Sequence, residues 1–79
     1  MKIYILTCVN EDGEIVSIDL YKTRALAQAS MAEQYYDERS DFEGRGFDLD
    51  SEHDYLTDNT ASTGTETLYY NWNIYEREL

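Results

Sequence analysis

The sequence predicts an α+β fold in which a small antiparallel sheet carries one helix packed on one face, in the order ββαβ or ββαββ. Lys2–Val9 and Glu14–Tyr21 are rich in β-branched and aromatic residues and flank a turn-forming stretch, which is typical of a β-hairpin. Helix-forming residues follow Thr23, and apolar residues alternate again over Thr67–Arg77, as in a strand with one buried face. A chain of 79 residues has room for one core, so we expect a single domain over residues 1–79.

The first two strands are expected to form a hairpin with a short loop. Val16, Ile18 and Leu20 alternate with Ser17 and Asp19 in the second strand, as is typical of a β-strand. Gly13 can adopt the positive φ that closes such a loop, so the turn is predicted at Asp12-Gly13.

The segment after the hairpin predicts a helix from Arg24 to about Arg39. Thr23 is a suitable N-cap, and the alanine, glutamine, methionine and glutamate residues that follow are good helix formers. Small residues recur there at helical spacing, and we expect them to face the sheet. This predicted stripe consists of Ala25, Ala29, Ala32 and Tyr36.

Residues around 40–66 are expected to form a long acidic loop. Gly44, Gly46 and Gly64 lie there among many Asp, Ser and Thr residues, although several apolar residues indicate that parts of the loop pack on the core. A short strand is expected near Asn59–Ser62. If a turn at Thr63-Gly64 joins it to the last strand, the order becomes ββαββ.

The last strand places Leu68, Trp72 and Ile74 on the side that we expect to be buried. Tyr69 and Tyr75 fall on the other side, where their rings can contact a partner.

Cysteine usage and hydropathy predict a cytoplasmic protein. A lone Cys8 cannot form an internal disulfide, and Cys8 with His53 falls short of the usual four-ligand zinc site. Met1–Val9 lacks the order of a secretory signal, because a strand-like pattern leads directly into a polar turn. No apolar run approaches the roughly 20 residues that span a bilayer, so we expect no membrane association.

Charge is the most unusual property of the composition. The chain has 17 Asp and Glu residues against 6 Lys and Arg, for a net charge of -11. Such a field repels phosphate and attracts basic protein surfaces, so direct nucleic-acid binding is not expected. With 42% hydrophobic and 14% aromatic residues, the chain is nevertheless expected to fold rather than remain an acidic disordered tail.

Two motifs partly match metal or catalytic sites. Acids recur at every second position over Asp48–Asp54, but a calcium loop needs glycine at its sixth place and glutamate at its twelfth, where His53 and Asn59 stand. Cys8, His53 and Asp54 have the residue types of a nucleophile, a base and an orienting carboxylate, yet Cys8 lies in a strand where a free cysteine is usually a packing residue. We expect no enzyme activity, metal or other cofactor.

Acidic residues are concentrated in one part of the chain. Eleven acids and two bases lie between Glu33 and Glu66. Because concentrating like charge costs self-repulsion, a basic partner is expected there; the alternative is a face that only confers solubility. Arginine also stacks on tyrosine. The candidate partner-binding residues are Glu33, Asp37, Glu38, Asp41, Glu43, Asp48, Asp50, Glu52, Asp54, Asp58, Tyr69 and Tyr75.

In size, acidity and expected fold the chain resembles small phage-encoded inhibitors, notably anti-CRISPR proteins and other DNA mimics. The acids from Glu33 to Glu66 and the aromatic stretch LYYNWNIYERE carry the resemblance, which involves no specific family motif. It implies a non-enzymatic protein in the host cell cytoplasm that blocks the basic nucleic-acid-binding surface of a CRISPR effector or restriction complex. The alternative is a small acidic interaction or regulatory module without nucleic-acid mimicry, for which a homodimer is one arrangement.

Overall fold

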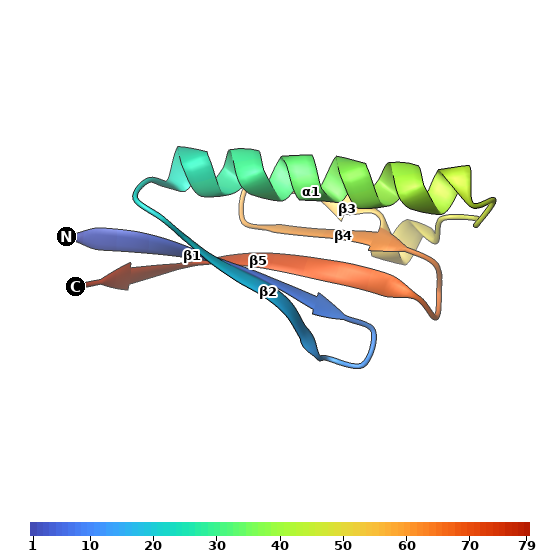
Figure 1. Cartoon of the computed structure of the whole chain (residues 1–79), viewed down its shortest axis with the longest axis horizontal. Helices are drawn as coiled ribbons and strands as arrows, with labels where there is room; N and C mark the ends of the chain where they lie inside the picture. The colour runs from blue at the N-terminus through green and yellow to red at the C-terminus, as the bar shows by residue number, and fades with distance from the viewer.

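The computed structural model describes all residues from Met1 to Leu79 and has the predicted α+β architecture. One helix lies across one face of a five-stranded antiparallel sheet of order β2-β1-β5-β4-β3 (Figure 1). The elements in chain order are β1 (Lys2–Asn10), β2 (Ile15–Tyr21), α1 (Arg24–Gly44), the 3-10 helix η1 (Ser51–His53), β3 (Tyr55–Leu56), β4 (Thr60–Gly64) and β5 (Tyr69–Glu78).

The hairpin of β1 and β2 forms as the sequence predicts. Gly13 has a φ of +77°, so the loop depends on a backbone conformation that glycine adopts without strain. The side-chain oxygen of Asn10 accepts hydrogen bonds from the backbone N–H groups of Asp12 and Glu14, both at 3.0 Å. A local side-chain cap therefore holds the turn.

Helix α1 begins where predicted but is longer than predicted. The Thr23 hydroxyl accepts a hydrogen bond from the Leu26 N–H at 3.2 Å, as an N-cap does. The helix continues past Arg39 to Gly44, and its additional turn buries Phe42. Burial of a large aromatic side chain outweighs the weak helix preference of the neighbouring serine and aspartate.

The helix stripe that faces the sheet is not the predicted one. Ala25, Ala29 and Tyr36 are exposed. The buried positions are Ala27, Met31, Tyr35 and Phe42, which are also spaced at a helical period. Both sets fit that period, but the second buries far more apolar area than one made largely of alanine.

Residues 40–66 contain more regular structure than the sequence pattern predicts. The short strand expected near Asn59–Ser62 is β4, which pairs with β5. Beyond it lie the two-residue strand β3, at the sheet edge, and η1. The turn between β4 and β5 comes after Gly64 rather than at Thr63-Gly64.

The core lies between α1 and one face of the sheet. Leu6, Met31 and Trp72 are almost completely inaccessible, and Ile74 is also buried, so Trp72 and Ile74 occupy the core as predicted. Leu68 is wrong as a core prediction: it precedes β5 in the turn and is exposed. Strand alternation therefore does not extend back to residue 68.

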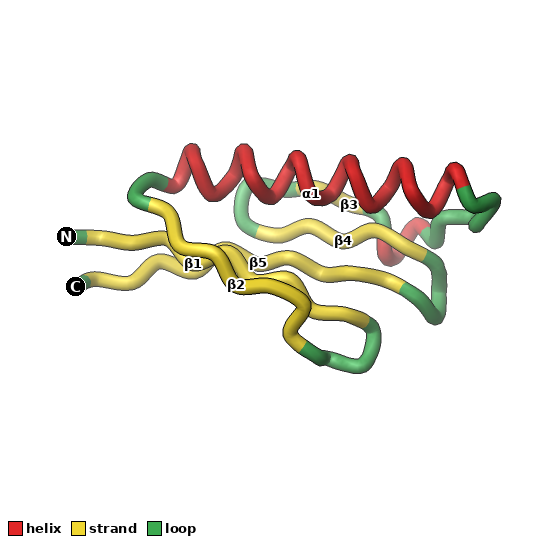
Figure 2. The backbone as a smooth tube through the Cα atoms, viewed as in Figure 1, coloured by secondary structure: helices red, strands yellow, loops and turns green.

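The other face of the sheet has no α-helix packed on it, and only η1 contacts it, at the β4–β5 end, where the His53 imidazole stacks on the Tyr69 ring. The backbone trace shows α1 on one side only, with both termini together at one end of a molecule measuring 44 × 22 × 17 Å (Figure 2). We call this uncovered side of the sheet the open face. Cross-strand register assigns Ile5, Ile18, Leu20 and Tyr75 to it, because each alternates with residues that face the helix.

Candidate functional site: an acidic groove beside the helix

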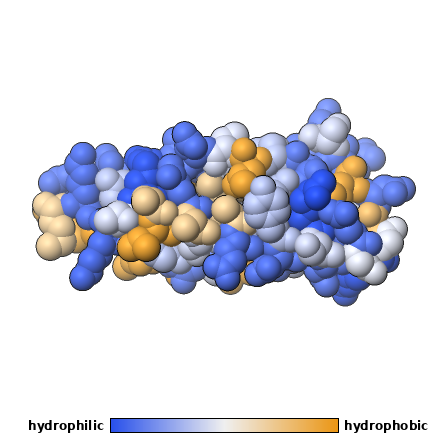
Figure 3. Space-filling view, turned by 90° about the horizontal axis from the view of Figure 1, so that it is seen from above, coloured by the Kyte–Doolittle hydropathy of each residue, from blue (hydrophilic) through white to orange (hydrophobic).

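Most carboxylates of the chain have no cation beside them. Eleven of the 17 form no ion pair, and Asp50 has only the His53 imidazole, at 3.9 Å. The helix side of the molecule is mainly hydrophilic, with isolated hydrophobic side chains (Figure 3). The acids that pair with Lys, Arg or the N-terminus are Asp41, Glu43, Asp54, Glu76 and Glu78.

Several unpaired carboxylates converge on a depression between α1 and the β1–β2 hairpin. Two adjoining hollows, of about 220 and 150 Å³, run along this side of the helix. Acids from the helix and from the hairpin line its walls, and apolar side chains from the sheet form its floor. We call this feature the acidic groove and define it by Glu11, Val16, Asp37, Glu38, Asp41 and Tyr70.

Helix periodicity explains the wall of the groove. Asp37, Glu38 and Asp41 occupy the flank of α1 beside the buried stripe, since residues three and four apart share one side of a helix. Arg45, one turn further on, approaches Asp41 to 3.6 Å and is the only cation that lines either hollow. Negative charge therefore exceeds positive charge in the groove.

Ionisation in the groove reflects this crowding. Burial raises the pKa of the Glu38 carboxyl, repulsion by Asp41 and Asp37 adds to the increase, and Arg45 opposes it. Burial likewise raises the pKa of the Tyr70 phenol, and Glu38, Glu11 and Asp41 contribute. Both shifts indicate a negative potential over an apolar floor, where a cation would be stabilised.

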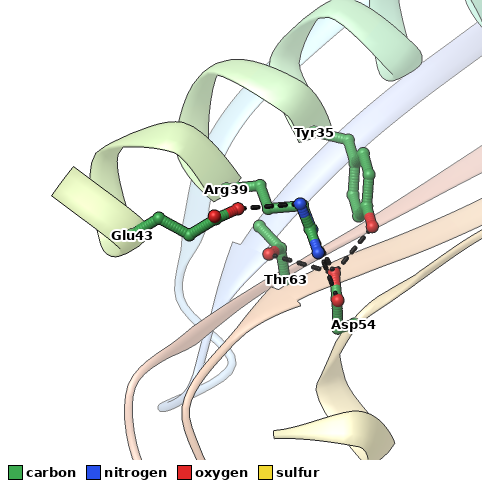
Figure 4. A network of polar contacts seen from close by, with 5 residues as sticks. All are labelled: Tyr35, Arg39, Glu43, Asp54 and Thr63. Atoms are coloured by element: carbon green, nitrogen blue, oxygen red, sulfur yellow. Dashed lines mark hydrogen bonds and ion pairs between the residues drawn. The ribbon is translucent and has the colours of Figure 1, made fainter. Parts of the chain in front are cut away.

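On the opposite flank of the helix, Arg39 forms ion pairs with Glu43 and Asp54 within a network of polar contacts (Figure 4). The Asp54 carboxylate accepts hydrogen bonds from the Tyr35 hydroxyl at 2.6 Å and from Arg39 Nε at 3.2 Å. Thr63 donates to it at 3.5 Å, and Arg39 Nη1 donates to Glu43 at 2.7 Å. The network fastens the start of β3 to the helix.

Asp54 is thus a structural carboxylate. Partial burial acts to raise its pKa, but the hydrogen bonds from Tyr35 and Arg39 outweigh burial and hold the pKa below its usual value. Burial, together with the same contact, raises the pKa of Tyr35 to about 12. Asp54 and Glu43, both predicted to bind a partner, are occupied within the chain.

The remaining predicted acids are dispersed. Asp48, Asp50 and Glu52 lie before or within η1, near the C-terminal end of α1. Asp58 lies in the turn between β3 and β4, where its backbone carbonyl accepts a hydrogen bond from Gln28. Glu33 is exposed on the helix and does not line the groove. The structure therefore brings only Asp37, Glu38 and Asp41 of the predicted acids together in the groove.

Tyr69 borders the first hollow of the groove, whereas Tyr75 lies outside the groove. Both fall on the open face by strand alternation. The Tyr69 ring stacks on the His53 imidazole with centroids 3.8 Å apart and an interplanar angle of 9°. Tyr75 is 47% exposed. Strand alternation correctly predicts that both residues lie on the face opposite Trp72, and only Tyr69 also borders the groove.

Cys8, His53 and Asp54 are not arranged as a nucleophile, base and orienting carboxylate. Cys8 is buried beneath the helix, and no hydrogen bond joins it to His53. Burial, with a smaller contribution from Glu38, raises the pKa of the Cys8 thiol to about 12, so the thiolate that reacts as a nucleophile is disfavoured. No group of three or more His, Cys, Asp or Glu side chains is placed to hold a metal ion.

Glu11 is the groove residue that sequence reasoning missed. It lies beside the hairpin turn, where it reads as an ordinary solvated loop acid. Its place opposite Asp41 depends on how the hairpin twists relative to the helix, which sequence spacing does not encode. The only available signal was its position directly after β1, at the end of a strand that carries core residues.

Comparisons of the chain with protein-family models, with curated protein sequences and with solved structures find no match. The single α-helix lacks the length of apolar sequence needed to cross a membrane. Inferences about function therefore depend on the groove and on the surfaces around it.

Proposed function

We propose that this chain is a non-enzymatic, cytoplasmic binding protein that occupies a basic nucleic-acid-binding surface of a partner protein. The observation that carries the proposal is the convergence of Asp37, Glu38, Asp41 and Glu11 on one groove, in a chain where most carboxylates lack an internal cation. Surfaces that bind DNA or RNA present rows of Lys and Arg. An acidic groove offers those side chains an alternative to phosphate.

The chemistry of the groove suits a Lys or Arg side chain. Val16 and Tyr70 provide apolar surface for the aliphatic stem, and the carboxylates on the walls attract the charged end. An incoming arginine would compete with Arg45 for Asp41.

Binding of this kind inhibits by exclusion. Groove carboxylates and the exposed acids Asp48 and Glu52 would engage cations that otherwise contact phosphate, so nucleic acid and this protein could not be bound together. Association would be accelerated by the opposite charges and slowed by salt. An anti-CRISPR protein or another phage-encoded DNA mimic would act in this way.

The test is competition at constant ionic strength. The immobilised protein is loaded with bacterial lysate, and short duplex DNA or RNA is then added. We expect nucleic acid to release the specific partner, which is identified by mass spectrometry. A purified partner that binds DNA or RNA equally well with this protein attached would contradict mimicry.

Matched variants localise the contact. Asp37→Asn with Asp41→Asn removes two groove charges, whereas Asp12→Asn with Glu14→Gln removes two from the hairpin turn. A local site predicts that the groove pair slows association with the purified partner by about tenfold or more, and the turn pair by much less. Equal effects would mean that only net charge matters.

A second candidate function is a small acidic interaction or regulatory module that does not mimic nucleic acid. The open face favours it, because the open face is apolar and lies away from the groove. The competition experiment separates the two functions: such a module binds its partner without displacing DNA or RNA.

A further inference from the structure

The open face departs from the usual pattern of a two-layer fold. An antiparallel sheet with one face in water normally has polar residues on that face. Here Leu20, Ile5 and Tyr75 form one row across three neighbouring strands, since Ile5 pairs with both of the others. Ile15 pairs with Val9 further along the sheet. Large apolar side chains therefore form a continuous surface over β2 and the adjoining part of β1, whereas Thr7, Asn71 and Asn73 interrupt it toward β5.

These side chains are strongly exposed. Leu20 is 64% accessible, Ile15 64% and Ile18 54%, although all three lie in a regular strand. Contiguous exposed apolar surface of this kind marks an interaction site in a soluble protein. Over β1 and β2 no segment of the chain packs against this face; η1 covers it only at the far end, beside Tyr69 of β5.

Charge on the open face is the opposite of what the composition suggests. None of the 17 acidic residues occupies a strand position on this face, and Arg77 is the one charged residue that does. Cross-strand alternation directs Asp19, Glu76 and Glu78 to the helix side. In a chain of net charge -11, this face is where a second acidic molecule can approach with least repulsion.

We propose that the open face is a dimer interface, and that its occupant is the same face of a second copy of this chain. A two-fold arrangement would stack the two sheets as in a β-sandwich, with the two helices on the outside. The acidic grooves would then remain exposed at opposite sides of the dimer. Dimerisation is independent of whether the grooves bind a basic partner.

The available area fits a weak, reversible contact. A side chain on one face of a sheet occupies about 30 Å², given a strand spacing of about 4.8 Å and a rise of about 3.4 Å per residue. Sixteen strand positions point to the open face, and two of them, Ser62 and Gly64, are already buried within the chain. The other fourteen cover roughly 400 Å², so two copies would bury on the order of 800 Å², the size of a weak, reversible interface.

Salt distinguishes this interface from the groove. Two copies of net charge -11 repel each other at long range, and added salt screens that repulsion. Dimerisation should therefore strengthen as NaCl rises. Binding of a basic partner to the acidic groove should weaken under the same change.

The experiment is sedimentation velocity from about 1 μM to about 1 mM protein at low and high NaCl. We expect reversible conversion from the 9.3 kDa chain to a species of twice that mass, with a lower dissociation constant at high salt. A chain that stays monomeric at about 1 mM in both salts would overturn the proposal.

Leu20→Glu is the diagnostic variant, and Leu26→Glu is its matched control. Leu26 is 53% exposed on the helix, so both changes add one charge at an exposed leucine, but only Leu20 lies on the open face. We expect Leu20→Glu to raise the dissociation constant about tenfold or more, because an unpaired carboxylate would be buried. Equal effects of the two variants would overturn the assignment of this face.

Two further measurements control for loss of folding and for pairing at the sheet edge. If Leu20→Glu reduces folding, Ile18→Thr with Leu20→Thr places a strand-favouring β-branched residue at both positions and should still weaken the dimer. Hydrogen exchange then separates face from edge contact, because β2 is also an open sheet edge. New protection of its outward amides on dimerisation would indicate edge pairing and overturn the face-to-face arrangement.

Discussion

Individual side chains of this protein affect stability in two ways: some fill a thin core, and others carry a charge that the folded state stabilises or destabilises. Trp72 belongs to the first group. It is 1% exposed, donates its indole N–H to Gln34 at 3.0 Å, and contacts the Tyr35 ring edge-on at 6.4 Å between centroids. Both its apolar surface and its polar atom are satisfied within the fold.

Trp72→Ala should therefore destabilise the fold by about 3–5 kcal/mol, the usual cost of truncating a buried aromatic residue. That loss is comparable to the whole stability expected of a core this small. Urea unfolding followed by circular dichroism measures it. Leu26→Ala, at an exposed position, should change stability by less than about 0.5 kcal/mol. A normally stable Trp72→Ala protein would contradict the core assignment.

Asp54 stabilises the folded state as a carboxylate. Its pKa is lower folded than unfolded, so its contribution is complete above the unfolded value and is lost as pH falls through the folded one. Asp54→Asn should cost about 1–3 kcal/mol at pH 7, because Tyr35 and Arg39 lose an ionised acceptor. The difference from wild type should shrink below about pH 4. Asp58→Asn, which breaks no side-chain contact, is the control.

Ionised Glu38 has the opposite effect on stability. Its folded pKa is raised, so the ionised carboxylate destabilises the folded state at neutral pH, and this penalty disappears as pH falls through the folded value. Glu38→Gln should increase stability at pH 7 by up to about 1 kcal/mol, limited by solvent screening. The gain should vanish in acid. If Glu33→Gln, outside the groove, stabilises equally at pH 7, repulsion within the groove is not the cause.

Among the elements, β4 shows most clearly how tertiary contacts select a strand. Its sequence, TASTG, has little apolar character, yet four of its five residues are buried beneath α1 and between β3 and β5. Gly64 closes the strand with a φ of +145°. A Cβ built at this position would lie 2.3 Å from the Leu68 carbonyl oxygen and 2.5 Å from the Tyr69 Cα.

Gly64→Ala should be strongly destabilising, by about 3 kcal/mol or more, because backbone atoms must move and the φ is unfavourable for alanine. Gly44→Ala is the matched control: it lies at the end of α1 with no atom near its added Cβ, and should stabilise by about 0.4–1 kcal/mol. Thermal unfolding of both variants checks the contrast. Similar melting temperatures would show that the β4–β5 turn tolerates a side chain.

At the scale of the whole molecule, the two sides have different chemistry. The helix side has the groove and an excess of carboxylates, while the open face is apolar and almost uncharged. The fold therefore separates long-range electrostatic attraction from short-range apolar contact. A basic partner and a second copy of the chain could be bound together.

The unpaired carboxylates should make stability depend on salt. They repel one another in the compact state, and added ions screen that repulsion more than they weaken the few surface ion pairs. We expect the melting temperature at a fixed low protein concentration to rise by several degrees between about 0.01 and 0.5 M NaCl. A decrease would mean that the ion pairs outweigh the repulsion.

Local patterns were sufficient to predict the hairpin, the Thr23 N-cap, the last strand and the burial of Trp72. Each depends on contacts between near neighbours, or on an alternation that a buried face requires. The class of fold follows from their order along the chain. Net charge, and the expectation of a basic partner, likewise need only the composition.

Tertiary structure alone decided which helix stripe is buried and which acids meet. Ala25 and Ala27 begin stripes of equal period, and contact with Leu6 and Trp72 in the sheet selects the one that includes Met31. Glu11 reaches the groove only because the hairpin twists alongside α1. The apolar open face is invisible in the strand pattern, because alternation does not say which side the single helix covers. These outcomes depend on long-range side-chain packing, in which several locally equivalent choices compete for one buried surface.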